Sequence, residues 1–250
     1  MRFDRWSIFN SAGGGGARTV TEIIQHSSNI GMVKIVEQMP RAVFYDGLKR
    51  LELDNITGTD LPFEAANILK GRNQFLMVPV EAATTAFGQG FSLTPLKLAQ
   101  LHAALANGGK LVTPHVVRGL FDSKGQPYWQ LPMPEPKQVF SADTTTKVLA
   151  MMEKVVESGT GRMARLRGYR IAGKTGTAQK ASDTGGYSKD ARITSFVGIL
   201  PVESPRYVVL AVIDEPMKGT GGKVAAPVVK SVIKSLINIE QIPPSSVRSK

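Results

Sequence analysis

The chain has 250 residues, enough for one large domain or two small ones, and its 42% apolar content excludes a disordered chain. It has no cysteine, which excludes disulfides, thiol catalysis and thiolate metal sites. The net charge of +11 allows an anionic partner, but the basic residues are scattered and no nucleic-acid motif accompanies them, so we predict no nucleic-acid partner.

The three histidines, His26, His102 and His115, do not show the spacing of metal ligands, so the sequence predicts neither a metal site nor a cofactor. No apolar run approaches the ~20 residues that cross a bilayer. The first six residues lack the apolar core of a signal peptide. As written, the sequence predicts no export signal and no anchor.

The N-terminal residues predict an irregular segment followed by two short helices. Residues 1–17 have no clear period and contain four consecutive glycines, typical of a flexible connector. Thr19 precedes Glu22 at the capping-box spacing, so a helix is expected to begin there. Ser27-Ser28-Asn29 then precedes a second helix from Ile30 to Val36. These short polar side chains serve either as caps or as functional groups at a helix junction.

The middle of the chain is predicted to be mainly helical. A helix opens at Pro40 and runs to Leu51, and another, from Thr94 to Ala106, has leucines at helical spacing. Residues 52–78 are expected to be irregular because they contain several turn formers. The glycines of Phe87-Gly88-Gln89-Gly90 predict a break.

From residue 110 the pattern changes to strands and then to a well-defined helix. Residues 110–121 predict strands around Pro114, residues 122–125 a hairpin turn, and residues 127–136 a proline-rich surface loop. The helix predicted over residues 141–158 has one apolar stripe and ends at Gly159-Thr160-Gly161.

The C-terminal third predicts strands with a helix laid on them. Strands are expected from Ile171, over Ile193–Leu200 and over Tyr207–Ile213, and the short link between the last two favours an antiparallel pair. A helix is expected over Ala225–Ile239 and a flexible tail over residues 241–250. This order of elements predicts an α+β fold with an antiparallel sheet and flanking helices.

The stretch from Arg170 to Ala178 places a cation, two hydroxyls and two glycines at the start of one of these strands. Lys174 supplies positive charge, and Thr175 and Thr177 supply hydroxyl donors, which together suit a carboxylate ligand. The glycines leave room for a backbone or a ligand to come close. Lys-Thr-Gly alone is a weak motif, so its weight depends on partners elsewhere in the chain.

Such a partner is present, because Ser27-x-Asn29 and Lys174-Thr175-Gly176 together resemble the motifs of class B penicillin-binding proteins, the D,D-transpeptidases of septal or elongation peptidoglycan synthesis. The resemblance covers roughly residues 18–240. It implies a partial penicillin-binding transpeptidase domain, with a β-lactamase-like fold that is incomplete at the N-terminus. The blocks that carry it are Ser27 to Lys34, Phe87 to Gly90, Leu93-Thr94-Pro95, Lys174 to Ala178, Phe196-Val197-Gly198 and Pro201.

The resemblance also implies roles for the motif residues. The Ser27 hydroxyl would relay a proton to the leaving amine, and the Asn29 amide would orient the substrate. Lys174 would attract the substrate carboxylate, and the Thr177 N–H would form half of an oxyanion hole. The residues expected to bind substrate are Lys174, Thr175, Gly176 and Thr177.

The family's first motif, Ser-x-x-Lys, does not occur ahead of Ser27. The one match in the chain, Ser231-Val232-Ile233-Lys234, falls on the expected C-terminal helix and is interpreted as part of its polar face. We therefore expect the supporting residues of a transpeptidase site without the nucleophilic serine. We also expect the chain to be inactive alone and to be the C-terminal part of a larger enzyme.

By the same resemblance, the parent enzyme would lie in the inner membrane, face the periplasm and crosslink peptidoglycan stem peptides during division. β-Lactams would bind its full-length form, and divisome or elongation proteins would be its partners. Three alternatives stay open: a non-catalytic peptidoglycan- or divisome-binding module of this fold, a β-lactam-sensing or β-lactamase relative, and a nucleic-acid-binding protein. The nucleic-acid-binding alternative rests only on net charge. Residues 87–114 favour the class B transpeptidase over a β-lactam-sensing or β-lactamase relative.

Overall fold

The computed structural model describes residues 1–3, 6–10, 16–182 and 186–245, and its centre is a three-stranded antiparallel sheet. The strands, in spatial order, are β7 (Ala172–Ala181), β8 (Tyr187–Leu200) and β9 (Tyr207–Asp214). The antiparallel pairing predicted for the last two strands is confirmed. β8 begins at Tyr187 rather than at Ile193, because its first residues extend the hairpin with β7 beyond the body of the sheet.

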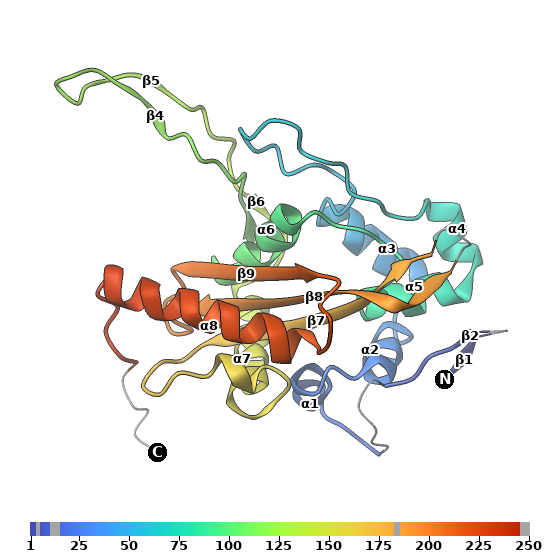
Figure 1. Ribbon diagram of the computed structural model, residues 1–250. Coiled ribbons are helices and arrows are strands. Elements are labelled where there is room, and N and C mark those ends of the chain that lie inside the picture. Colours follow the sequence, from blue (N-terminus) through green and yellow to red (C-terminus); the bar gives the residue numbers. More distant parts are fainter. Residues whose placement is uncertain (4–5, 11–15, 183–185, 246–250) are drawn as a thin grey trace.

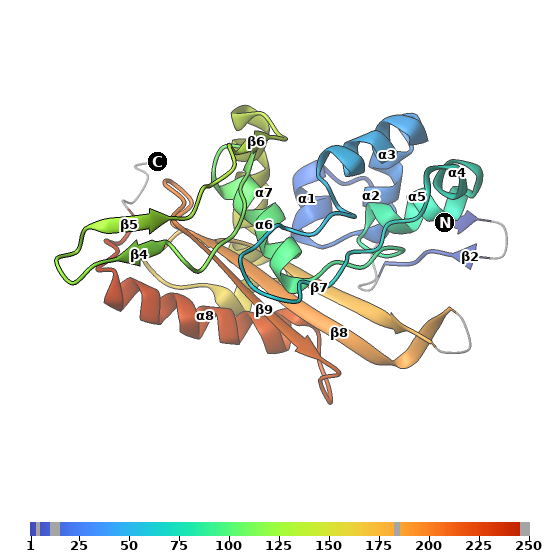
Figure 2. The ribbon, with the colours of Figure 1, turned by 90° about the horizontal axis from the view of Figure 1, so that it is seen from above.

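Helices cover both faces of this sheet (Figures 1 and 2). α8 (Gly221–Ile239) lies along one face, and α6 (Pro95–Ala106) and α7 (Ala142–Ser158) lie on the other. Consecutive residues of β8 point to opposite faces, so Phe196 joins the core under α8 and Val197 joins the core under α7. The α+β fold predicted from the sequence is confirmed.

The N-terminal helices form a separate packed group beside one end of the sheet (Figure 2). Thr19 makes the predicted capping box with Glu22 at the start of the first of them. Phe75 is fully buried at the centre of this group, against Tyr45 and Leu48. The helices of the group are α1 (Val20–Gln25), α2 (Asn29–Val36), α3 (Arg41–Arg50), α4 (Arg72–Met77) and α5 (Pro79–Ala86).

Two predictions for the connecting segments were wrong. Residues 52–78 are not wholly irregular, because burial of Phe75 stabilises α4 in a stretch whose local composition favours turns. Residues 127–136 are not simply a surface loop, since β5 (Pro127–Gln130) pairs with β4 (Gly119–Phe121) in a projecting hairpin. The two remaining short strands, β3 (Lys110–Leu111) and β6 (Lys137–Gln138), pair with each other.

Both ends of the chain are better ordered than their composition predicts. The short strands β1 (Arg2–Phe3) and β2 (Trp6–Ser7) pair, and Ile8 is buried against α2 and α5, so the prediction of an irregular segment was wrong for these residues. Ile242 is 4% exposed in the core under α8, and Ser245 Oγ accepts from the Arg170 N–H, so residues of the predicted flexible tail contact the body of the domain. Residues 246–250 lie outside the described part.

Candidate functional site

The Lys-Thr-Gly motif lies on β7, where Lys174 is opposite Val197 of β8. α8 begins directly against this motif, because its first residue is glycine. A Cβ atom at Gly221 would come 2.4 Å from the Gly176 carbonyl oxygen and 2.2 Å from that of Ser195. The Gly221 N–H donates to Thr177 Oγ1 at 3.1 Å. Because position 221 is glycine, the start of α8 can lie directly against β7, the strand that carries the motif, and hydrogen-bond to it.

The Ser27-Ser28-Asn29 motif lies at the junction of α1 and α2. Ser27 has a φ of 51°, a left-handed conformation that non-glycine residues rarely adopt. Ser28 is the N-cap of α2, and its hydroxyl accepts from the Gly31 N–H at 3.1 Å. The capping role and the functional role, which the sequence left as alternatives, thus fall on different serines.

The two motifs meet in space. Lys174 Nζ donates a hydrogen bond to Ser27 Oγ and a second one, of 3.0 Å, to the Thr175 carbonyl oxygen. Ser27 Oγ also lies 3.5 Å from Thr175 Oγ1. Residues separated by about 150 positions in the chain therefore form one continuous polar contact.

Two of the predicted site residues have other partners. The Asn29 side-chain amide, expected to orient the substrate, donates to the Phe9 carbonyl oxygen of the N-terminal segment at 2.9 Å. Thr177 Oγ1 is engaged by Gly221, as described above. The hydroxyls that meet beside Lys174 are those of Ser27 and Thr175.

Burial lowers the pKa of Lys174 from its ordinary value of 10.5 to about 8. Burial also lowers the pKa of His102 on α6. The Leu98 carbonyl, 2.8 Å from His102 Nδ1, opposes that effect, and the charge of Lys174 adds to it. His102 is therefore a neutral neighbour, and Lys174 carries the positive charge of the site.

Thr160 is a site residue that the sequence analysis missed. Its Oγ1 lies 3.0 Å from Thr175 Oγ1, and its N–H donates to the Gln25 carbonyl at 3.2 Å. It thereby connects the end of α1, the loop after α7 and β7. Gly159-Thr160-Gly161 reads only as a helix stop in the sequence, because nothing local indicates which strand its hydroxyl meets.

No group of His, Asp or Glu residues in the described ranges could hold a metal ion, and none of the described helices is long and apolar enough to span a membrane. Ser231 and Lys234 are both exposed on α8, in agreement with the expected polar face.

The fold and the two meeting motifs agree with the transpeptidase resemblance, and comparison with known proteins identifies the family. Residues 1–234 match the family model described as "Penicillin binding protein transpeptidase domain". The chain belongs to the penicillin-binding protein transpeptidase family. The match includes the first seventeen residues, which we had expected to lie outside the domain.

Relatives and solved structures agree with this assignment. The chain is 43% identical over 242 residues to a peptidoglycan D,D-transpeptidase FtsI homolog from Mesostigma viride, covering 90% of this chain and 40% of the relative. It is 40% identical over 227 residues to stage V sporulation protein D from Bacillus subtilis, covering 89% and 34%. The crystal structure of penicillin-binding protein 3 from Mycobacterium tuberculosis with ampicillin superposes with a TM-score of 0.85 at 31% identity, covering 93% of this chain and 53% of that one.

The chain thus spans 40% or less of the length of these two curated relatives. What the whole relatives do is therefore a matter of proposal for this chain.

Proposed function

We propose that this chain forms part of the active site of a division-type peptidoglycan D,D-transpeptidase. It would supply the residues that bind the substrate carboxylate and the residue that relays a proton. The observation that carries the proposal is the hydrogen bond from Lys174 Nζ to Ser27 Oγ, which joins the family's second and third motifs. The relatives named as FtsI homologs support the division type over the elongation type.

The chemistry of the site suits the C-terminal carboxylate of a peptidoglycan stem peptide. The Lys174 ammonium would attract the carboxylate, and the Thr175 and Thr177 hydroxyls would hydrogen-bond it. Gly176 would let the peptide backbone approach β7 closely. Ser27, already bonded to Lys174, would pass a proton to the amine that leaves during acyl transfer.

Asn29 would orient the substrate backbone only after its amide exchanged the Phe9 carbonyl for the substrate. No Ser-x-x-Lys precedes Ser27 in this sequence. The proposal for this chain is therefore confined to binding and proton transfer.

The wider setting is proposed by the same resemblance. The parent enzyme would act at the inner membrane on its periplasmic side, with divisome proteins as partners. β-Lactams would bind the full-length form, as ampicillin binds the related penicillin-binding protein 3. A non-catalytic binding module of the same fold is the second candidate, because Lys174, Thr175 and Thr177 would bind a carboxylate whether or not acylation follows.

The carboxylate assignment is tested by binding of an acyl-D-Ala-D-Ala peptide and of the same peptide with an amidated C-terminus, measured by titration calorimetry. We expect the free acid to bind at least ~10-fold more tightly, because the ammonium attracts only the charged form. Lys174→Met should abolish that preference. The matched control is Lys180→Met on the same strand, since Lys180 Nζ pairs with Asp214 and Glu215. Equal affinity for both peptides would overturn the proposal.

A further inference from the structure

Ser27 and Lys174 have an arrangement that a passive binding wall does not require. Ser27 holds a left-handed φ of 51° immediately ahead of the N-cap of α2, and this conformation carries its hydroxyl to the Lys174 ammonium. Strained backbone conformations of this kind persist where the surrounding structure holds them, and they are concentrated at functional sites. Both residues are half-buried.

We propose that Ser27 and Lys174 form a serine–lysine dyad, in which Ser27 Oγ is itself a nucleophile toward activated acyl and phosphonyl donors. This inference does not depend on the proposed binding of stem peptides. It assigns to Ser27 a covalent step in place of the supporting proton relay.

The proposed reaction balances with the groups that the chain holds. Neutral Lys174 Nζ takes the Ser27 hydroxyl proton while Oγ forms a bond to the carbonyl carbon of an activated ester. The tetrahedral intermediate expels the alcohol, which leaves with the bonding electron pair and receives the proton from the Lys174 ammonium. Water then hydrolyses the Ser27 ester by the same route, with Lys174 again accepting and returning the proton. Neither a metal nor a redox partner is needed.

Lys174 can act as the base because a fraction of it is neutral near physiological pH. Burial lowers its pKa to about 8, so roughly half of it is neutral at pH 8 and about one part in a hundred at pH 6. His102 on α6 is the titratable side chain whose pKa responds to the Lys174 charge, and burial keeps that imidazole neutral. Thr160 and Thr175 contribute no titratable group to the pair, only their hydroxyls and the Thr175 carbonyl oxygen.

The strand also offers a donor for the developing oxyanion. β7 is an edge strand in the described part of the chain, so alternate residues direct their N–H and C=O groups away from β8. The Thr175 carbonyl is directed to the Lys174 side, where it accepts from Nζ. Residues two apart on a strand face the same way, and the Thr177 N–H therefore faces the dyad.

The test is covalent labelling of the 250-residue chain with a fluorophosphonate, followed by peptide mapping in the mass spectrometer. Attack of Ser27 Oγ on phosphorus would displace fluoride and leave a stable adduct on Ser27. We expect the labelling rate to rise with pH around a midpoint near 8, the pKa of Lys174. Ser27→Gly should abolish the adduct while keeping the fold, because glycine readily adopts a left-handed φ.

Two lysine variants separate a base from a structural partner. Lys174→Met should slow labelling by about 100-fold or more, the usual contribution of a general base. Lys174→Arg keeps the charge and the hydrogen bond but cannot lose its proton, so it should be equally slow. Ser235→Ala, on the exposed side of α8, is the matched control and should label at the rate of the unchanged chain.

Several outcomes would overturn the dyad. These are an adduct on another residue, including Lys174 itself, unchanged labelling of Ser27→Gly, or a Lys174→Arg variant that labels at the original rate. Preferential binding of the free-acid peptide without labelling of Ser27 would refute the dyad and support the proposed function. Labelling of Ser27 without a preference for the free-acid peptide would support the dyad and refute the proposed function.

Discussion

Burial of the Lys174 ammonium destabilises the folded state, and the size of this effect depends on pH. Its pKa falls from 10.5 to about 8 on folding, so the unfolded chain binds more protons between these two values. Stability therefore rises as pH increases from 8 toward 10.5, and the penalty for burying the ammonium is fully present below pH 8.

Lys174→Met removes this pH-dependent term. The free energy of unfolding of the unchanged chain should increase, relative to that of Lys174→Met, by about 2–3 kcal/mol between pH 7 and pH 10. The difference between the two proteins cancels the other titrating lysines. Urea unfolding at both pH values measures it, and a constant difference across this range would contradict the burial of the ammonium.

Thr160 acts on the site through Thr175, so it is a positioning residue. Thr160→Val removes the 3.0 Å hydroxyl contact and should lower the free energy of unfolding by only about 1 kcal/mol. The same change should weaken binding of a D-Ala-D-Ala peptide, because the Thr175 hydroxyl loses its fixed orientation. Thr160→Ser keeps the hydroxyl and should restore binding. A purely structural role for Thr160 would instead reduce stability without changing the affinity of the folded protein.

At the scale of single residues, the sequence was informative where a motif has a fixed spacing. Ser27 and the Lys174 run were found because two short motifs occurred in the family's order, and the structure brings Ser27, Lys174 and Thr175 together. Thr160 was missed because its partner lies across a tertiary contact. The hydrogen bond from Asn29 to Phe9 could not be predicted either, since the segment before Thr19 has no periodic pattern.

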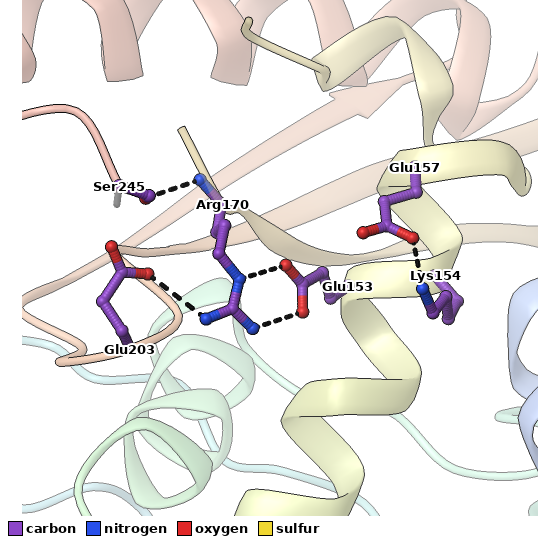
Figure 3. Close-up of polar contacts among 6 residues, drawn as sticks. All are labelled: Glu153, Lys154, Glu157, Arg170, Glu203 and Ser245. Carbon is purple, nitrogen blue, oxygen red and sulfur yellow. Dashed lines mark hydrogen bonds and ion pairs between the residues drawn. The ribbon is translucent and has the colours of Figure 1, made fainter. Parts of the chain in front are cut away.

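Among the larger elements, the segment that leads into β7 is held by an ion pair that no sequence pattern had indicated. Arg170 makes two hydrogen bonds to the Glu153 carboxylate, of 2.6 and 2.7 Å, and lies 3.8 Å from Glu203 (Figure 3). Its N–H donates to Ser245 Oγ at 3.0 Å. Arg170, the residue that leads into the Lys-Thr-Gly strand, thereby joins α7 and the β8–β9 turn through its side chain and the C-terminal segment through its backbone.

Glu153→Gln tests how much the Arg170–Glu153 ion pair contributes to the free energy of unfolding. The Glu153 side chain is only 10% exposed, so its loss leaves the half-buried guanidinium with a poorer partner and should cost about 2 kcal/mol of unfolding free energy. Glu157→Gln is the matched control on the same helix, because Glu157 pairs with Lys154 at the surface and should change stability by less than about 0.5 kcal/mol. Thermal or urea unfolding compares the two variants. Equal effects would show that the Arg170 pair is no stronger than a surface pair.

Helices with strong local signals were predicted well, and elements that depend on tertiary packing were not. α6 and α7 have caps and apolar stripes that can be read directly from the sequence. α4 has six residues and no side-chain cap, and it forms because Phe75 is buried between neighbouring helices. β5 was hidden by the prolines around it, although Trp129 lies opposite Leu120 across the hairpin.

On the scale of the whole molecule, both outer strands of the central sheet have one unpaired edge among the described residues. β8 has hydrogen-bonded neighbours on both sides over Ile193–Ile199, whereas β9 pairs only with β8 among the described residues. Residues of β9 pack alternately into the cores under α8 and under α6 and α7, which covers both faces of the strand. The outer edge of β9, like that of β7, therefore lacks a partner strand in the described chain.

This arrangement predicts a two-residue alternation in amide hydrogen exchange along Tyr207–Asp214. Amides that point to β8 should be protected at least ~10³-fold, and those on the outer edge should exchange close to the rate of an open chain. β8 is the internal control, because every amide over Ile193–Ile199 has a neighbouring strand and should be protected. Exchange measured by NMR on a dilute sample distinguishes the two patterns. Since a long apolar edge also pairs with other strands, the fast β9 amides should become protected as the protein concentration is raised; uniform protection of β9 in the dilute monomer would mean that the edge is already covered.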